Sequence, residues 1–183
     1  MRVALLICLL STLAPAQEEF SDQAYKFSFT VPAGMHRLTT EERAAITGMT
    51  LEEARNKARE GSQTKRLEHH HVWLEPAGNS VYGREIDLRL VDYIPFQGPD
   101  DFREFLRNQG MEILREEKIG YPLGPALLLD CTASGPPPEN QPIRMYVLFI
   151  ARLQRWATLY LRSNAGDFPI VEPDFRELIQ TIQ

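Results

Sequence analysis

The sequence predicts an α+β domain, a three-layer α/β/α sandwich with a mainly antiparallel central sheet. Segments that alternate apolar and polar residues, as half-buried strands do, recur along the chain, and four strand-like segments follow one another between residues 111 and 162. The segment 143–151 is apolar on both faces, which is typical of an inner strand covered on each side. Segments with helical spacing near residues 99–110 and 173–182 can supply these covers.

The first 16 residues have the features of a secretory signal peptide. Arg2 provides a positive start, residues 3–13 are almost wholly apolar, and a small-x-small pattern of the kind that signal peptidases cut ends at Ala16. The apolar stretch is much shorter than the roughly 20 residues that span a bilayer as a helix. We therefore expect cleavage between Ala16 and Gln17, export to a periplasm or the extracellular space, and no stable membrane insertion of the cleaved protein.

Residues 17–183 have a length that suits one domain with one core. Without the signal peptide, which contains Arg2 and no acidic residue, the chain has 19 basic and 25 acidic side chains and a net charge of −6. This charge argues against nucleic acid and anionic lipid as partners. Cys131 is then the only cysteine, so the domain has no internal disulfide. The lack of an Asn-x-Ser/Thr acceptor favours a bacterial source.

The first predicted strand covers residues 25–31, where aromatic and polar side chains alternate before a Pro-Ala-Gly turn. Residues 39–66 have few large apolar side chains and are expected to form a peripheral helical insertion. Residues 39–42 and 50–53 within it each fit a Thr-x-x-Glu capping box, which predicts two short helices.

Two strands, a helix, four strands and a closing helix are predicted after the insertion. The strands are expected at residues 67–75, 84–93, 111–118, 126–133, 143–153 and 156–162. The first helix is expected to begin near Pro99, where two acidic residues suit a helix N-terminus, and to end near Gly110. The closing helix is expected to begin at Pro173. Its apolar side chains recur at helical spacing: Phe175, Leu178, Ile179 and Ile182.

This order of elements resembles the α/β/α sandwich of the PsbP-like and DcrB-like family. Residues 27–34, Phe-Ser-Phe-Thr-Val-Pro-Ala-Gly, are similar to the opening strand and Pro-x-Gly turn of that family, and residues 101–106 and 156–182 fit the same layout. The resemblance implies a PsbP-like fold and a non-catalytic accessory or interaction role. It names no partner, and no functional residue of the family has a counterpart in this sequence.

The run His69-His70-His71 is the first candidate for a metal site. Strand alternation puts His69 and His71 on one face about 7 Å apart, a spacing that two metal ligands can use. The local sequence offers no third or fourth ligand, and Trp73 continues the same face. We therefore expect a partly exposed strand face, and the sequence predicts no metal, cofactor or catalytic residue.

Two further residues, Cys131 and Asp130, are candidates for a catalytic role. Cys131 shares a strand face with Leu127 and Leu129, which favours a small buried hydrophobe over a nucleophile. Asp130 lies on the opposite face, where an ion pair or a structural hydrogen bond is expected rather than a general base. The apolar residues 93–96 before the helix have two explanations, a hydrophobic staple or a contact with a partner or ligand.

The sequence thus predicts an exported, non-catalytic accessory or interaction module with an unknown protein partner. A carrier of a small apolar ligand is the alternative, and a cofactor-free hydrolase is the third interpretation. A well-packed core on both sheet faces favours the interaction module, and an apolar pocket of several hundred Å³ favours the carrier. A polar cleft that unites a nucleophile, a base and hydrogen-bond donors favours the hydrolase.

Overall fold

The computed structural model describes residues 17–46, 68–75, 83–92, 96–135, 141–152 and 155–183. Three sequence expectations concern residues outside these ranges. They are the signal peptide up to Ala16, the second helix of the insertion and the apolar residues 93–95.

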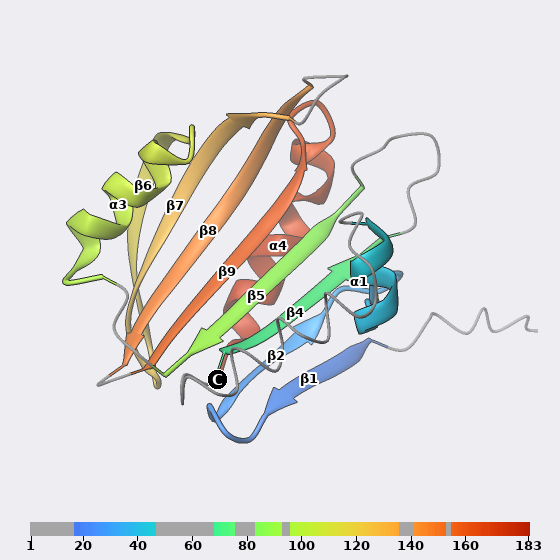
Figure 1. The fold of residues 1–183 in the computed structure, drawn as a ribbon, viewed down its shortest axis with the longest axis horizontal. Helices are drawn as coiled ribbons and strands as arrows, with labels where there is room; N and C mark the ends of the chain where they lie inside the picture. Colours follow the sequence, from blue (N-terminus) through green and yellow to red (C-terminus); the bar gives the residue numbers. More distant parts are fainter. Residues whose placement is uncertain (1–16, 47–67, 76–82, 93–95, 136–140, 153–154) are drawn as a thin grey trace, which may run out of the picture.

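The described residues contain one large antiparallel sheet with the strand order β3-β4-β5-β9-β8-β7-β6 (Figure 1). The seven strands in it are β3 (His36–Arg37), β4 (Glu68–Leu74), β5 (Glu85–Val91), β6 (Glu112–Tyr121), β7 (Gly124–Ser134), β8 (Pro142–Arg152) and β9 (Arg155–Asn164). Each pair of neighbouring strands in this sheet is antiparallel, from the β3–β4 pair to the β8–β9 pair. The predicted α+β class with a mainly antiparallel sheet is therefore confirmed.

One face of this sheet packs against α3 (Pro99–Asn108). Phe102 of α3 stacks on Phe149 of β8 with ring centroids 4.3 Å apart, and Leu106 of α3 is fully buried. Phe96, in the connection before α3, lies 5.1 Å from the Phe102 ring, so packing on the helix accounts for this apolar residue. The buried members of the cluster are Val91, Phe102, Leu106, Leu127, Leu129, Cys131, Ile143, Met145, Val147, Phe149, Trp156 and Tyr160.

The other face packs against α4 (Phe168–Thr181) and a two-stranded ribbon, β1 (Glu18–Asp22) paired with β2 (Phe27–Val31) (Figure 1). Tyr146, Leu148 and Ile150 of β8 belong to this cluster and are at most 2% exposed. Both faces of β8 are therefore buried. From the helix and the ribbon, the cluster takes Phe20, Phe27, Phe29, Val31, Phe168, Phe175, Leu178 and Ile179.

The closing helix begins at Phe168, so the predicted start at Pro173 was wrong. Pro169 lies in the first turn of the helix. Backbone N–H groups in this turn have no acceptor within the helix, so a proline costs no hydrogen bond there. Pro173 follows four residues later, and its absent N–H would have paired only with the carbonyl of Pro169. Buried Phe168 anchors this first turn in the core, which lets the helix extend through both prolines.

The expectation that the strand at residues 25–31 opens the domain was also wrong, because β1 precedes it. Phe20 is the one buried side chain of β1 and its only apolar one, so the segment has no alternation that a sequence pattern could detect. The ring of Phe20 packs edge-on against Trp73 of β4, with centroids 5.0 Å apart. The ribbon thus joins the large sheet through side chains.

The first capping box of the insertion is confirmed at α1 (Thr40–Ile46). The backbone N–H of Thr39 donates to Glu42 Oε2 at 2.7 Å, and the N–H of Glu42 donates to Thr39 Oγ1 at 3.2 Å. This is the reciprocal pair that the Thr-x-x-Glu pattern predicts.

No helix of the described residues has the length and apolarity to cross a membrane.

The end of the chain is tied to β2. Ser28 and Gln183 exchange two backbone hydrogen bonds of 3.0 Å each. The backbone N–H of Thr30 donates to the hydroxyl of Thr181 at 2.9 Å. The last turn of α4 and the ribbon therefore hold each other in place over the sheet.

Leu178→Ala should lower the free energy of unfolding by about 2–5 kcal/mol, because Leu178 is 1% exposed and its truncation leaves a cavity between α4 and the sheet. Ile170→Ala on the same helix is the matched control. Ile170 is 76% exposed, so its change is expected to stay within about 0.5 kcal/mol. Urea unfolding of the two variants measures the difference, and equal effects would contradict the burial described for α4.

Candidate functional site

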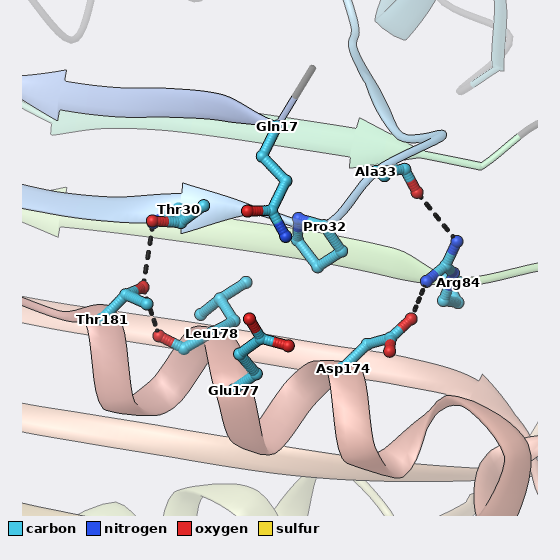
Figure 2. A pocket seen from close by; sticks show the side chains of 9 residues that line it. All are labelled: Gln17, Thr30, Pro32, Ala33, Arg84, Asp174, Glu177, Leu178 and Thr181. Atoms are coloured by element: carbon cyan, nitrogen blue, oxygen red, sulfur yellow. Dashed lines mark hydrogen bonds and ion pairs between the residues drawn. The ribbon is translucent and has the colours of Figure 1, made fainter. Parts of the chain in front are cut away.

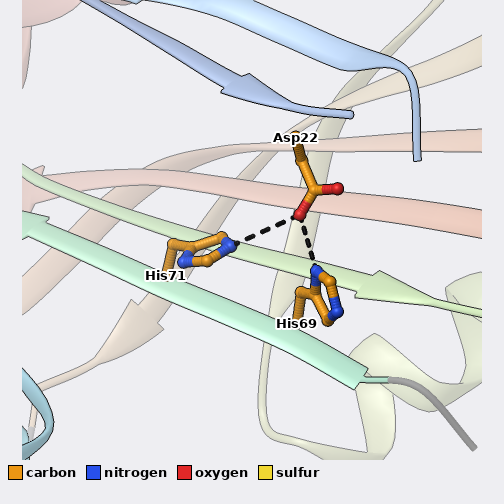
Figure 3. Close-up of side chains that lie close together, drawn as sticks. All are labelled: Asp22, His69 and His71. Carbon is orange, nitrogen blue, oxygen red and sulfur yellow. Dashed lines mark hydrogen bonds and ion pairs between the residues drawn. The ribbon is translucent and has the colours of Figure 1, made fainter. Parts of the chain in front are cut away.

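Three side chains from two separate segments meet beneath the ribbon: Asp22, His69 and His71 (Figure 3). One potential ligand atom from each lies within 4.8 Å of the other two. Asp22 Oδ2 is 2.6 Å from His69 Nδ1 and 3.9 Å from His71 Nε2. Alternation in β4 directs both imidazoles to the side of the sheet that the ribbon covers, as the sequence predicted for this pair.

Asp22 is the residue that sequence reasoning missed. It ends β1, 47 positions before His69, and no local pattern links it to the histidines. The backbone N–H of Tyr25 donates to Asp22 Oδ1 at 3.0 Å in the turn that leads to β2. This bond directs the other carboxylate oxygen towards the histidines, and Asp-x-x-aromatic at a hairpin turn is the only signal that could have suggested it.

Aromatic rings and a guanidinium lie around the cluster. Phe20 lies 4.9 Å from the His71 ring, and Tyr25 lies 5.0 Å from the His69 ring. Arg37 of β3 contacts His71 Nδ1, and its guanidinium carbon also lies 5.4 Å from the centre of the Phe20 ring. The site therefore combines partly buried donors with one exposed cation.

These surroundings change the acidity of two members of the cluster. Burial, together with the positive charge of Arg37, lowers the pKa of His71 to about 4. Burial would raise the pKa of Asp22, but hydrogen bonds from His69 and the Tyr25 backbone outweigh it and lower this pKa. At neutral pH the group thus contains a carboxylate and a neutral His71 ring, a donor set suited to a divalent metal.

His70 points to the opposite face of the sheet. Its Nε2 lies 2.8 Å from Asp87 Oδ1, and its Nδ1 lies beside the guanidinium of Arg43. Asp87 is 5% exposed, and its other oxygen lies 3.8 Å from Arg162. Burial would raise the pKa of Asp87, but the hydrogen bond from His70 and the nearby arginine charges lower it to about 2. This arrangement keeps a buried carboxylate charged.

Cys131 and Asp130 lie where the sequence predicted. Cys131 is fully buried, and burial together with the adjacent Asp130 charge raises the pKa of its thiol to about 12. Asp130 accepts hydrogen bonds of 2.8 and 3.1 Å from Arg144, which confirms the predicted ion pair. Neither side chain has the setting of a nucleophile or a general base.

A cleft of about 300 Å³ separates the end of the ribbon from α4 (Figure 2). Arg84 lies at one end of the cleft. It donates to Glu75 at 2.7 and 2.9 Å and to the carbonyl of Ala33 at 3.0 Å, and it forms an ion pair with Asp174 of α4. Through these bonds the guanidinium joins the ends of β4 and β5 to the turn after β2 and to α4. The lining residues are Gln17, Thr30, Pro32, Ala33, Arg84, Asp174, Glu177, Leu178 and Thr181.

A larger groove of about 690 Å³ lies between the β6–β7 hairpin and the C-terminal half of α4. The hydroxyl of Tyr121 donates to the carbonyl of Ile179 at 2.9 Å and joins its two sides. Apolar and polar side chains mix in its lining, which consists of Glu117, Ile119, Gly120, Tyr121, Pro122, Leu128, Arg176, Ile179, Gln180, Ile182 and Gln183.

Asp87→Asn should remove part of the acid sensitivity of the fold. Because the pKa of Asp87 falls from an ordinary 3.8 to about 2 on folding, the charged carboxylate stabilises the protein fully above pH 4 and loses this effect as the pH falls to 2. Urea unfolding between pH 2 and 7 should give a variant that is less stable by about 2 kcal/mol at pH 7, with a smaller loss towards pH 2. Asp100→Asn, at a side chain that is 96% exposed, is the control and should keep the wild-type pH profile.

Comparisons with protein-family models and with curated proteins found no match. Solved structures do match. The chain is similar to cyanobacterial PsbP (CyanoP) from Synechocystis sp. PCC 6803, with a TM-score of 0.58 and 11% sequence identity over 96% of each chain. It is also similar to the Ran-binding protein Mog1p from Saccharomyces cerevisiae, with a TM-score of 0.52 and 9% identity over 92% of this chain and 95% of that one. At these identities the likeness concerns the fold, and the chain has a PsbP-like fold.

Proposed function

We propose that the protein is an exported, non-catalytic module that binds another protein. The observation that carries this proposal is the packing of the large sheet, since apolar side chains fill both of its faces. The two large hollows lie beside α4, at the border of one cluster, where Leu178 and Ile179 form part of their walls. A domain built in this way offers its partner an outer surface rather than an interior chamber.

We also infer the three-layer order that the sequence predicts. In this arrangement α3 forms one outer layer, and α4 together with the ribbon forms the other. The two separate apolar clusters support it, because Phe102 and Leu106 of α3 belong to one cluster and Phe175 and Leu178 of α4 belong to the other. Each face of the sheet then has its own cover.

Export of the chain is inferred from the signal-peptide pattern of residues 1–16. β1 begins at Glu18, so cleavage between Ala16 and Gln17 removes no strand or helix of the described fold. The net charge of −6 after cleavage favours a protein partner over nucleic acid or an anionic membrane surface. The fold is compatible with protein binding, since Mog1p is described as Ran-binding. The destination is a periplasm or the extracellular space.

A carrier of a small apolar ligand is the second candidate, and the groove beside α4 favours it. Its volume of about 690 Å³ is within the range of ligand pockets, and Leu128, Ile179 and Ile182 contribute apolar surface. Glu117, Arg176 and Gln180 also line it, so a bound apolar molecule would share the groove with charged and amide groups.

Purification of the protein from its native source after chemical cross-linking distinguishes these functions. We expect an intact mass that lacks residues 1–16 and a cross-linked protein that mass spectrometry identifies at specific residues. The destabilised variant Leu178→Ala controls for chaperones that capture unfolded chains. Recovery of a stoichiometric small apolar molecule with no cross-linked protein would replace the interaction module with the carrier, and an uncleaved chain in the cytoplasm would contradict export.

Cys131 should resist thiol reagents in the folded protein, because its sulfur is buried and its pKa is raised to about 12. We expect labelling at pH 8 to be slower than in urea-unfolded protein by at least about 100-fold, since reagent reaches the thiol only through opening of the fold. Mass spectrometry of the Cys131 peptide measures the rate and separates it from any Cys8 signal. Rapid native labelling would support the hydrolase interpretation instead.

A further inference from the structure

The cluster of Asp22, His69 and His71 has donor atoms at distances close to those of a metal site (Figure 3). Zinc bonds of about 2.0–2.2 Å in tetrahedral geometry place neighbouring ligand atoms about 3.3–3.6 Å apart. The Asp22 oxygen lies 2.6 Å from one imidazole nitrogen and 3.9 Å from the other, so the present distances lie on either side of this value. Small side-chain rotations would bring them to it.

Partly buried contacts already orient each donor. The hydrogen bond from the Tyr25 backbone holds one oxygen of Asp22 and leaves Oδ2 to face the histidines. Phe20 packs against the His71 ring, and Tyr25 packs against the His69 ring. Side chains held in this way lose little conformational freedom when they coordinate an ion.

One buried nitrogen in the cluster lacks a hydrogen bond. His71 Nε2 is buried and has no hydrogen-bond partner among the described residues. The carboxylate oxygen that it faces is 3.9 Å away, which is too far for a hydrogen bond. A buried polar atom left in this state costs free energy, and an ion between this nitrogen and Asp22 would remove that cost.

We propose that Asp22, His69 and His71 bind a divalent transition-metal ion of the zinc class and that this ion links the β1–β2 ribbon to strand β4. Two imidazoles and one carboxylate form a donor set that zinc uses commonly, with water in the remaining position. The two histidines come from the large sheet and the carboxylate from the ribbon, so the ion is a cross-link between them. This inference is independent of the proposed function.

Arg37 is the competitor of the metal in this site. Its guanidinium, which has only N–H donors, contacts His71 Nδ1, so the proton of the neutral ring lies on Nε2. Coordination through Nε2 requires that the proton move to Nδ1 and that the guanidinium withdraw. His69 Nδ1, which donates a hydrogen bond to the Asp22 carboxylate, must likewise pass its proton to Nε2 before it binds the ion. Arg37 is exposed and can move into solvent. Its positive charge also opposes that of the ion.

Zinc titration of the protein, purified without a histidine tag, tests the proposal. We expect one bound Zn²⁺ per chain by calorimetry and a melting temperature that rises with zinc concentration and returns to its initial value in EDTA. His69→Gln, His71→Gln and Asp22→Asn should each weaken zinc binding by at least about 10-fold. Melting of each variant in EDTA verifies that it folds.

His70→Gln and His36→Gln are the matched controls, because His70 faces the opposite side of β4 and His36 is exposed on β3. Both should keep the wild-type zinc affinity. Zinc affinity that survives in the His69→Gln, His71→Gln and Asp22→Asn variants would overturn the proposal. The same holds for a wild-type protein whose melting temperature does not respond to zinc, since the cluster would then be an ion pair alone.

Arg37→Ala provides a second, opposite readout. Removal of the competing guanidinium should strengthen zinc binding by several-fold, while the three ligand variants weaken it. Weaker binding in Arg37→Ala would contradict the coordination through His71 Nε2 that we propose.

Discussion

The burial of β8 and β9 on both faces is the constraint on which the rest of the structure depends. Leu148 and Phe149 are successive residues of β8 that point to opposite faces, and each is at most 2% exposed. Exposing either side chain to water would cost about 1.5–3 kcal/mol. One cover is therefore not enough, and α3 and α4 are each required on their own side of the sheet.

The ribbon and α4 together cover one face of the large sheet. Trp73 lies on β4, near the edge of the sheet, and is fully buried. Phe20 and Phe29 from the two ribbon strands contact its ring, with centroid distances of 5.0 and 5.4 Å. Because β1 lies over this part of β4, its last residue, Asp22, is placed next to His69 and His71. The candidate metal site is thus a consequence of how a hydrophobic surface is covered.

Sequence patterns located the elements whose burial is periodic and missed those whose burial depends on a single side chain. The segment 143–153 was recognisable because β8 is apolar on both faces, and the Thr39 capping box because its bonds are local. β1 escaped detection because Phe20 is its only apolar residue. The start of α4 was misplaced because Pro173 resembles a first-turn proline, whereas buried Phe168 determines where the helix begins.

Local periodicity also explains which part of the candidate site was predictable from the sequence. Alternation within one strand is enough to place His69 and His71 together, and to separate His70 from them. Asp22 reaches the pair only through tertiary packing, and neither its position nor that of Arg37 follows from a local pattern. A third candidate ligand that comes from a distant segment of the chain cannot be found by spacing alone.

The bond between Thr30 and Thr181 joins residues 151 positions apart. During synthesis, the ribbon leaves the ribosome long before its helical partner exists, and closure of so long a loop carries a large entropic cost. Final docking of the amino-terminal strands must therefore wait for the synthesis of α4. Until α4 is present, the apolar side chains of the ribbon that pack against this helix stay exposed, and exposed apolar surface of this kind favours aggregation of incompletely folded chains.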